Sequence, residues 1–180
     1  SSEVFEMQLR YTTPLLAGTK ASYSGNITEW EWTQKTGQAD RANTYTFSYD
    51  SLYRLSETRQ YIAGNLNNQY VEKGILYDEN GNILAMQRTA NGNLVDNLSY
   101  VYSGNQLASL KESIRTSPVG DIYLPGSTLN GTYTYDENGN MISDSRKALK
   151  FEYNCLNLLK DVKTTSGEVK ARYSYLADGT

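Results

Sequence analysis

The hexapeptide YDENGN occurs at residues 77–82 and again, letter for letter, at residues 135–140. Each copy carries an Asn-Gly pair, Asn80-Gly81 or Asn138-Gly139, between an aromatic run and an apolar residue. A type I′ hairpin turn prefers this dipeptide because both of its central residues need a positive φ angle. We therefore predict a hairpin tip in each copy, with a shorter loop and a bulge at Gly81 as the alternative.

The other residues of the hexapeptide receive structural roles. We expect Asp78 and Asp136 to accept hydrogen bonds from amides of the turn, and Tyr77 and Tyr135 to return to the core face of a sheet. The predicted turn residues are Tyr49, Asp50, Tyr77, Asp78, Asn80, Gly81, Asn82, Tyr135, Asp136, Asn138, Gly139 and Asn140.

A calcium loop is the competing interpretation of the same residues, because DENGN supplies several side-chain oxygens. An EF-hand loop needs glycine at its sixth position and glutamate at its twelfth. Those positions hold Ile83 and Thr89 in one copy and Met141 and Lys147 in the other. The sequence therefore favours a turn, and we expect no metal site and no cofactor.

Composition excludes several classes of function. The 180 residues include 17 Lys and Arg against 20 Asp and Glu, one cysteine and no histidine. Zinc sites of the Cys/His type, Ser-His-Asp triads and imidazole catalysis need residues that this sequence lacks. The net charge of −3 argues against nucleic acid as a partner, and no apolar run approaches a membrane span. Cys155 is expected to be a small packed side chain.

Aromatic residues alternate along the chain, and 16 of them are tyrosine. In YTFSY, Tyr45, Phe47 and Tyr49 fall on one face of a strand, and threonine and serine fall on the other. Similar runs recur as WEW, YVY, YTY, LKFEY and YSY, which predicts an all-β chain built from antiparallel hairpins. The expected buried face carries Tyr45, Phe47, Tyr49, Tyr77, Tyr133, Tyr135, Phe151 and Tyr153.

The aromatic runs repeat at a roughly constant distance. Their last tyrosines are Tyr23, Tyr49, Tyr77, Tyr102, Tyr135, Tyr153 and Tyr175, with spacings of 26, 28, 25, 33, 18 and 22 residues. A period near 25 residues predicts stacked repeats that form a curved, solenoid-like sheet. The longest interval contains Pro118 and Pro125, so we expect an inserted loop at residues 113–131.

The segments YDSLYRLSE, YDENGNILAMQRT, YDENGNMISDSRKALKFEY and YSYLADGT resemble the YD repeats of the Rhs family, which includes teneurins and the shell proteins of toxin complexes. The resemblance is clear over residues 45–180 and weak over residues 1–44, so we treat 1–180 as one repeat domain. It implies a spiral of hairpins that forms part of a shell around or beside a C-terminal effector domain. It supplies no catalytic residue, because the family's DPxGL-type motif is absent here.

The first functional hypothesis is a noncatalytic structural segment of a secreted or cell-surface protein. Its expected partners are neighbouring repeats or an effector domain of the same parent protein. The start SSEVFEMQ, without methionine, and the end YLADGT, within a repeat, lead us to expect a fragment of a longer chain.

Two alternatives remain open. A carbohydrate- or protein-binding module would use exposed aromatic rings, with Trp30 and Trp32 as the candidate residues. A hydrolase would need a carboxylate pair such as Asp78 and Asp136, but both are predicted turn residues on separate hairpins. We therefore expect no enzymatic activity.

Overall fold

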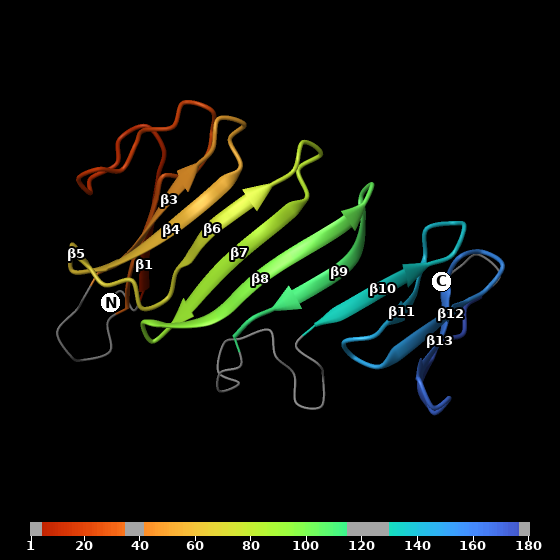
Figure 1. Cartoon of the computed structure of the whole chain (residues 1–180). Helices are drawn as coiled ribbons and strands as arrows, with labels where there is room; N and C mark the ends of the chain where they lie inside the picture. Colours follow the sequence, from red (N-terminus) through yellow and green to blue (C-terminus); the bar gives the residue numbers. More distant parts are fainter. Residues whose placement is uncertain (1–4, 35–41, 115–129, 177–180) are drawn as a thin grey trace. The chain divides into compact units, whose positions relative to one another are not determined.

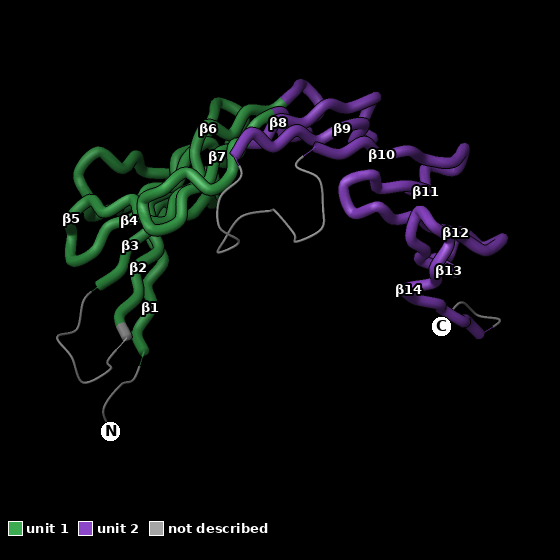
Figure 2. Tube along the Cα trace, turned by 60° about the horizontal axis from the view of Figure 1, so that its bottom comes forward, with its two compact units in different colours: residues 1–77, 85–97 green, residues 78–84, 98–180 purple. Residues whose placement is uncertain are grey.

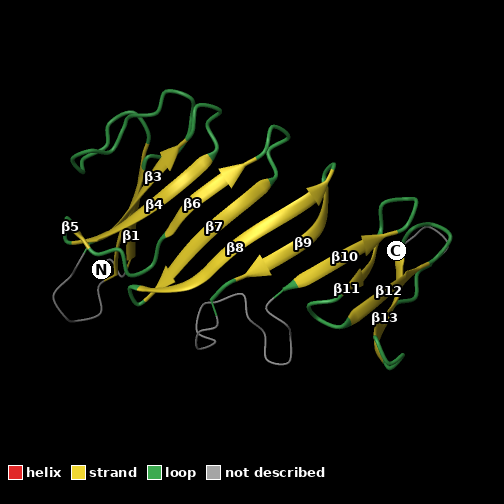
Figure 3. Cartoon of the chain, in the orientation of Figure 1, coloured by secondary structure: helices red, strands yellow, loops and turns green. Residues whose placement is uncertain are grey.

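The computed structural model describes residues 5–34, 42–114 and 130–176, and this part of the chain is entirely β-structure and turns (Figures 1 and 3). The predicted all-β fold is therefore confirmed. The strands are β1 (Phe5–Arg10), β2 (Glu29–Gln34), β3 (Asn43–Tyr49), β4 (Leu55–Ile62), β5 (Asn65–Leu66), β6 (Glu72–Tyr77), β7 (Ile83–Ala90), β8 (Asn93–Ser103), β9 (Gln106–Glu112), β10 (Gly131–Tyr135), β11 (Met141–Asp144), β12 (Leu149–Tyr153), β13 (Leu159–Thr164) and β14 (Val169–Arg172).

Strands that are neighbours in sequence are also neighbours in the sheets. One sheet has the order β1 to β5, and the other runs from β6 to β14, again in sequence order. Pairings between consecutive strands, such as β1 with β2, β3 with β4 and β8 with β9, are antiparallel, as short connections require. The inserted loop expected at residues 113–131 falls between β9 and β10, and its residues 115–129 lie outside the described part of the chain.

The chain divides into two compact units, coloured separately in Figure 2. Unit 1 comprises residues 1–77 and 85–97, and unit 2 comprises residues 78–84 and 98–180. Within unit 1, β6 lies beside β4, where the amide of Glu72 donates to the hydroxyl of Thr58 at 2.8 Å. Within unit 2, β9 to β14 form a ladder of successive antiparallel strands.

The aromatic face is less covered than its alternation predicts. Tyr45, Phe47 and Tyr49 are only half-buried, whereas Thr44 and Thr46 on the opposite face of β3 are 4% and 6% exposed. On β10 and β12 the aromatic side is the more covered of the two faces, as expected, but on β3 it is the less covered one. The reason lies in the long β1–β2 connection, residues 11–28, which folds over the threonine face.

Residues of the β1–β2 connection contact the face of β3 that carries Thr46. Glu29 pairs directly with Thr46 across the sheet, so both side chains share a face. The carboxylate of Glu29 binds backbone amides of the connection, and residues 17–19 line a small cavity together with Thr46. Small threonine side chains beneath a loop lose nearly all their exposure, while large rings on an open face keep part of theirs.

Candidate functional site

The repeated turns share one hydrogen-bond pattern. At Asp78 and Asp136 the backbone amide donates to the carbonyl four residues ahead, and the carbonyl accepts from the amide three residues ahead. Asp50 and Asn154 make the same two backbone contacts, so Asn154 replaces aspartate without changing the turn. Thr164 makes both contacts too, so five copies of one turn lie at hairpin ends within the described residues, and four of them directly follow a repeat tyrosine.

The predicted type I′ geometry is wrong for the hexapeptide. Gly81 and Gly139 have φ of 89° and 86°, but Asn80 and Asn138 do not have positive φ. The amide of Gly139 donates to the carbonyl of Asp136, three residues earlier, and the strand register shifts at Tyr135. Both features indicate a type I turn closed by a glycine bulge. The alternative considered for Gly81 is the arrangement found. Turns with two successive positive φ angles occur instead at Ala63-Gly64 and Asn91-Gly92, at the other ends of the strands.

Side-chain oxygens of the turn aspartates are occupied inside the turn. Oδ1 of Asp78 accepts the amide of Asn82 at 2.8 Å, and Oδ2 accepts Nδ2 of the same asparagine at 2.8 Å. Oδ1 of Asp136 accepts the amides of Asn138 and Asn140 at 3.0 and 2.8 Å, and Oδ2 accepts Nδ2 of Asn140 at 2.9 Å. These oxygens act as acceptors for the turn, which is the role predicted for them.

The hydrogen bonds change the acidity of the carboxyls. The side-chain amide of Asn82 lowers the pKa of Asp78, and that of Asn140 lowers the pKa of Asp136. The backbone amide of Arg54 lowers the pKa of Asp50. Each donor favours the charged form of its acceptor, so the turns are most stable when these aspartates are ionised.

A second pattern joins one hairpin to the hairpin before it. Hydroxyls of the repeat tyrosines donate to a backbone carbonyl at the start of an outgoing strand or within two residues of it. The donors and acceptors are Tyr49 to Ile27 at 2.7 Å, Tyr77 to Leu55 at 2.8 Å, Tyr135 to Leu107 at 3.0 Å, Tyr153 to Met141 at 2.9 Å and Tyr175 to Leu159 at 2.7 Å. Here we name these five bonds the tyrosine ladder. Each bond gives a partner to the hydroxyl of a half-buried tyrosine and sets the register between two stacked hairpins.

Turns of adjacent hairpins are also linked through side chains. Nδ2 of Asn82 donates to Oδ1 of Asn105 at 3.1 Å, and Nδ2 of Asn140 donates to Oδ1 of Asn157 at 3.0 Å. The guanidinium of Arg54, bound to Asp50 at 2.7 Å, lies 4.5 Å from the ring centre of Tyr77. The polar groups of the repeated turns are thus used to hold neighbouring hairpins together.

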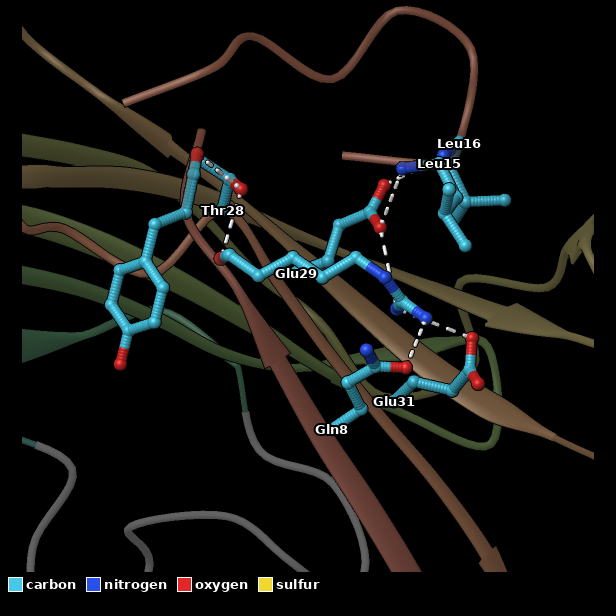
Figure 4. Close-up of polar contacts among 8 residues, drawn as sticks. Gln8, Leu15, Leu16, Thr28, Glu29 and Glu31 are labelled. Atoms are coloured by element: carbon cyan, nitrogen blue, oxygen red, sulfur yellow. Dashed lines mark hydrogen bonds and ion pairs between the residues drawn. The ribbon is translucent and has the colours of Figure 1, made fainter. Parts of the chain in front are cut away.

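The β1–β2 connection, residues 11–28, departs from this short-turn pattern. Tyr23, which the repeat spacing placed at the end of an incoming strand, lies in this connection instead. A cluster at its base holds it in place (Figure 4). The carboxylate of Glu29 is fully buried and accepts the amides of Leu15 at 2.9 Å and Leu16 at 2.7 Å. Arg10 lies 3.6 Å from Glu29 and 3.4 Å from Glu31.

The C-terminal end of the connection is bound both to its own start and to the turn at residues 50–54, here named the first YD turn. The hydroxyl of Thr28 donates to the carbonyls of Arg10 and Tyr11, each at 3.0 Å. Nδ2 of Asn26 donates to the carbonyl of Tyr53 at 3.0 Å. Buried ionic and hydrogen-bonding contacts therefore hold both ends of a long loop that would otherwise cost considerable conformational entropy to order.

A pocket of about 520 Å³ lies between this connection and the end of β3 in unit 1. Four aromatic side chains contribute to its wall: Tyr23, Phe47, Tyr49 and Tyr53. Tyr23 and Tyr53 are 87% and 65% exposed. The polar part of the wall includes Lys20, Ser22, Ser24, Asn26, Ser48 and Asp50. Its size and mixed lining are typical of a ligand pocket.

Sequence reasoning did not identify this pocket. The available signal was the segment between QLRY and EWEW, which lacks strand alternation and is much longer than the other turns. A connection of this length is often functional. Its position against Tyr53, however, depends on contacts between residues far apart in the chain.

The candidate binding residues Trp30 and Trp32 form a cluster with Tyr45. The ring centres of the two tryptophans are 4.6 Å apart, and Tyr45 stacks 5.7 Å from Trp32 with an interplanar angle of 8°. Both tryptophans are half-buried. Their arrangement supplies packing between β2 and β3, since aromatic pairs at these distances stabilise each other.

The single cysteine lies at the surface. Cys155 is exposed in the turn after β12, so the expectation that it packs in the interior is wrong. Cys155 is exposed because residues 154–158 form the same tight turn as the aspartate copies, and this turn lies at the end of a hairpin. Over the described residues, no group of three or more His, Cys, Asp and Glu side chains could hold a metal ion, and no helix is long and apolar enough to cross a bilayer.

Comparisons with known proteins gave a distant structural likeness. The chain is similar to a chain from the solved structure of a mutated Tc holotoxin pore of Photorhabdus luminescens, with 12% sequence identity and a TM-score of 0.41. The match covers 92% of this chain and 11% of that chain. Searches against models of protein families and against curated proteins found no match.

Proposed function

We propose that this chain is a noncatalytic wall segment of a larger YD-repeat protein of the Rhs type. The tyrosine ladder carries this proposal. In each of its five bonds, the residue that marks the repeat in the sequence also joins consecutive hairpins in space. A sequence signature whose hydroxyls stack hairpins in five copies supports a structural role.

The chemistry of the turns supports the same role. The repeated carboxylates of Asp78 and Asp136 accept hydrogen bonds from their own turns and are therefore committed to structure. General acid or base catalysis would need a carboxyl group directed at a substrate. The proposal therefore includes no catalytic residue and no cofactor. Its partners are neighbouring repeats or an effector domain of the same secreted or surface protein.

The parent protein provides the test. We expect the coding sequence around this segment to contain further Tyr-Asp turns at about 25-residue spacing. We also expect the full-length protein to protect a C-terminal segment from added protease. Tyr135→Ala combined with Tyr153→Ala should weaken that protection, because both remove a ladder bond, while Tyr173→Ala outside the ladder should not.

Two results would contradict the wall proposal. One is a parent chain without further repeats. The other is a C-terminal segment cleaved equally fast in the wild type and in the double ladder variant, provided that wild-type repeats resist the protease.

A further inference from the structure

The pocket between the β1–β2 connection and the first YD turn contains an unusual backbone position. Tyr53 has φ of 62°, a left-handed conformation that bulky side chains rarely adopt. The equivalent position in the other copies holds Gly81, Gly139, Asn157 and Gly167, with φ of 89°, 86°, 59° and 94°. Glycine and asparagine are the residues that tolerate this conformation best. Strained positions of this kind cluster at functional sites, and here the strain places a tyrosine ring on the pocket wall.

The part of the wall that carries Tyr23 is also ordered by contacts within the protein. Tyr23 belongs to the connection whose base is bound by the buried carboxylate of Glu29. Asn26 and the hydroxyl of Tyr49 join the same connection to the turn and to the end of β3. Two exposed rings are therefore presented on an ordered frame, which lowers the entropy cost of binding.

The polar groups of the wall limit the class of ligand. The carboxylate of Asp50 is engaged by the amides of Leu52 and Arg54 and by the guanidinium of Arg54. The side-chain amide of Asn26 donates to a backbone carbonyl. Asn26 and Asp50, whose planar side chains could bind paired hydroxyls of a sugar, therefore already make hydrogen bonds within the protein. The ion pair with Arg54 also offsets the negative charge of Asp50.

The groups that remain for a ligand are aromatic rings, single hydroxyls and the ammonium of Lys20. Over the described residues, the hydroxyls of Tyr23 and Tyr53 make no hydrogen bond to the protein, and both rings are largely exposed. A polyproline II helix presents flat apolar rings and isolated, fully solvated carbonyls, and it loses little entropy on binding. Aromatic-lined grooves recognise such helices by stacking on proline and donating to these carbonyls.

We propose that the pocket formed by Tyr23, Phe47, Tyr49 and Tyr53 binds a proline-rich segment in the polyproline II conformation. The two exposed tyrosines stack on proline rings, and their hydroxyls donate to backbone carbonyls of the segment. Phe47 forms the apolar part of the wall. Tyr49 belongs both to the pocket and to the tyrosine ladder, but the two ring positions that contact the ligand, Tyr23 and Tyr53, lie outside the ladder, so the binding role can be tested separately from the wall function.

Fluorescence anisotropy of a labelled ten-residue polyproline peptide, titrated with the whole chain, tests the proposal. We expect saturable binding that weakens about tenfold or more in Tyr23→Ala and in Tyr53→Gly, as is typical for loss of an aromatic anchor. Tyr53→Gly is the sharper variant. It removes the ring and also relieves the left-handed strain, so its melting temperature should equal or exceed that of the wild type. Tyr173→Ala, which removes an exposed tyrosine in unit 2, is the matched control and should bind as the wild type does.

A labelled Gly-Ser peptide of equal length and a neutral cellulose oligosaccharide complete the design. The proposal predicts no saturable binding of the first and no displacement of polyproline by the second. It is overturned if polyproline does not bind, if the Gly-Ser peptide binds equally well, or if the oligosaccharide displaces polyproline. It is also overturned if folded Tyr53→Gly retains full affinity.

Discussion

The tyrosine ladder makes a quantitative prediction for Tyr135→Phe, which removes only a hydroxyl. That hydroxyl donates to the carbonyl of Leu107 at 3.0 Å from a half-buried ring, 28 residues away in the sequence. A net hydrogen bond of this kind contributes about 1 kcal/mol to the free energy of unfolding. For a unit of this size, the melting temperature should fall by roughly 4–8 °C.

The neighbouring Tyr133→Phe is the matched control. Tyr133 lies two residues earlier on β10, but its hydroxyl makes no hydrogen bond to another described residue, so its replacement should change stability by less than about 0.5 kcal/mol. Thermal and urea melts followed by far-UV circular dichroism measure both. Tyr153→Phe and Tyr175→Phe should resemble Tyr135→Phe, because their bonds are 2.9 and 2.7 Å long. Equal stability of Tyr135→Phe and Tyr133→Phe would refute the ladder as a stabilising device.

Tyr135→Ala tests the ring in addition to the hydroxyl. A fully buried aromatic ring costs ~3–5 kcal/mol to truncate, and the half-burial of Tyr135 places the expected loss at or below the lower end of that range. If Tyr135→Ala lowers the free energy of unfolding no more than Tyr135→Phe does, the packing of the ring contributes nothing to stability.

Three further predictions concern the turns and one ion pair between β13 and β14. The lowered pKa values mean that the folded state binds fewer protons than the unfolded chain. Ionised aspartates therefore stabilise the folded state fully at pH values above the unfolded aspartate pKa of ~3.9, and this stabilisation is lost as the pH falls through the lower folded pKa values. We expect the urea concentration at the unfolding midpoint to decrease when the pH is lowered below about 4 and to stay constant above that pH. The aspartates concerned are Asp50, Asp78, Asp136 and Asp161, the last through its bond to Arg172. Gly139→Ala should destabilise by about 1 kcal/mol or more in denaturant melts because its φ is 86°, whereas Asn157→Gly should not destabilise; the reverse order would exclude the bulge geometry. Calcium and chelators should leave the melting temperature unchanged, since both oxygens of Asp78 already accept hydrogen bonds, and a calcium-dependent increase abolished by Asp78→Ala would contradict the turn assignment.

The sequence by itself determined the β-strands, the position of the YD turns and the structural use of their aspartates. These features depend on interactions over two to five residues, such as the alternation of side chains along β3 and the contact between Asp136 and Asn140. Even the identity of the φ-positive glycines could be predicted, although the turn type could not, because Asn80 and Asn138 adopt either geometry at similar cost.

Only the tertiary structure decided which faces are covered and what the tyrosine hydroxyls bind. Thr46 is buried because a loop anchored on Glu29 crosses its face, and Tyr77 finds its acceptor 22 residues earlier in the chain. The pocket at Tyr23 and Tyr53 also depends on distant residues, because Asn26 of the β1–β2 connection binds the carbonyl of Tyr53, 27 residues later in the sequence. Contacts of this kind depend on how hairpins stack, and side-chain alternation within a strand carries no information about what lies above either face.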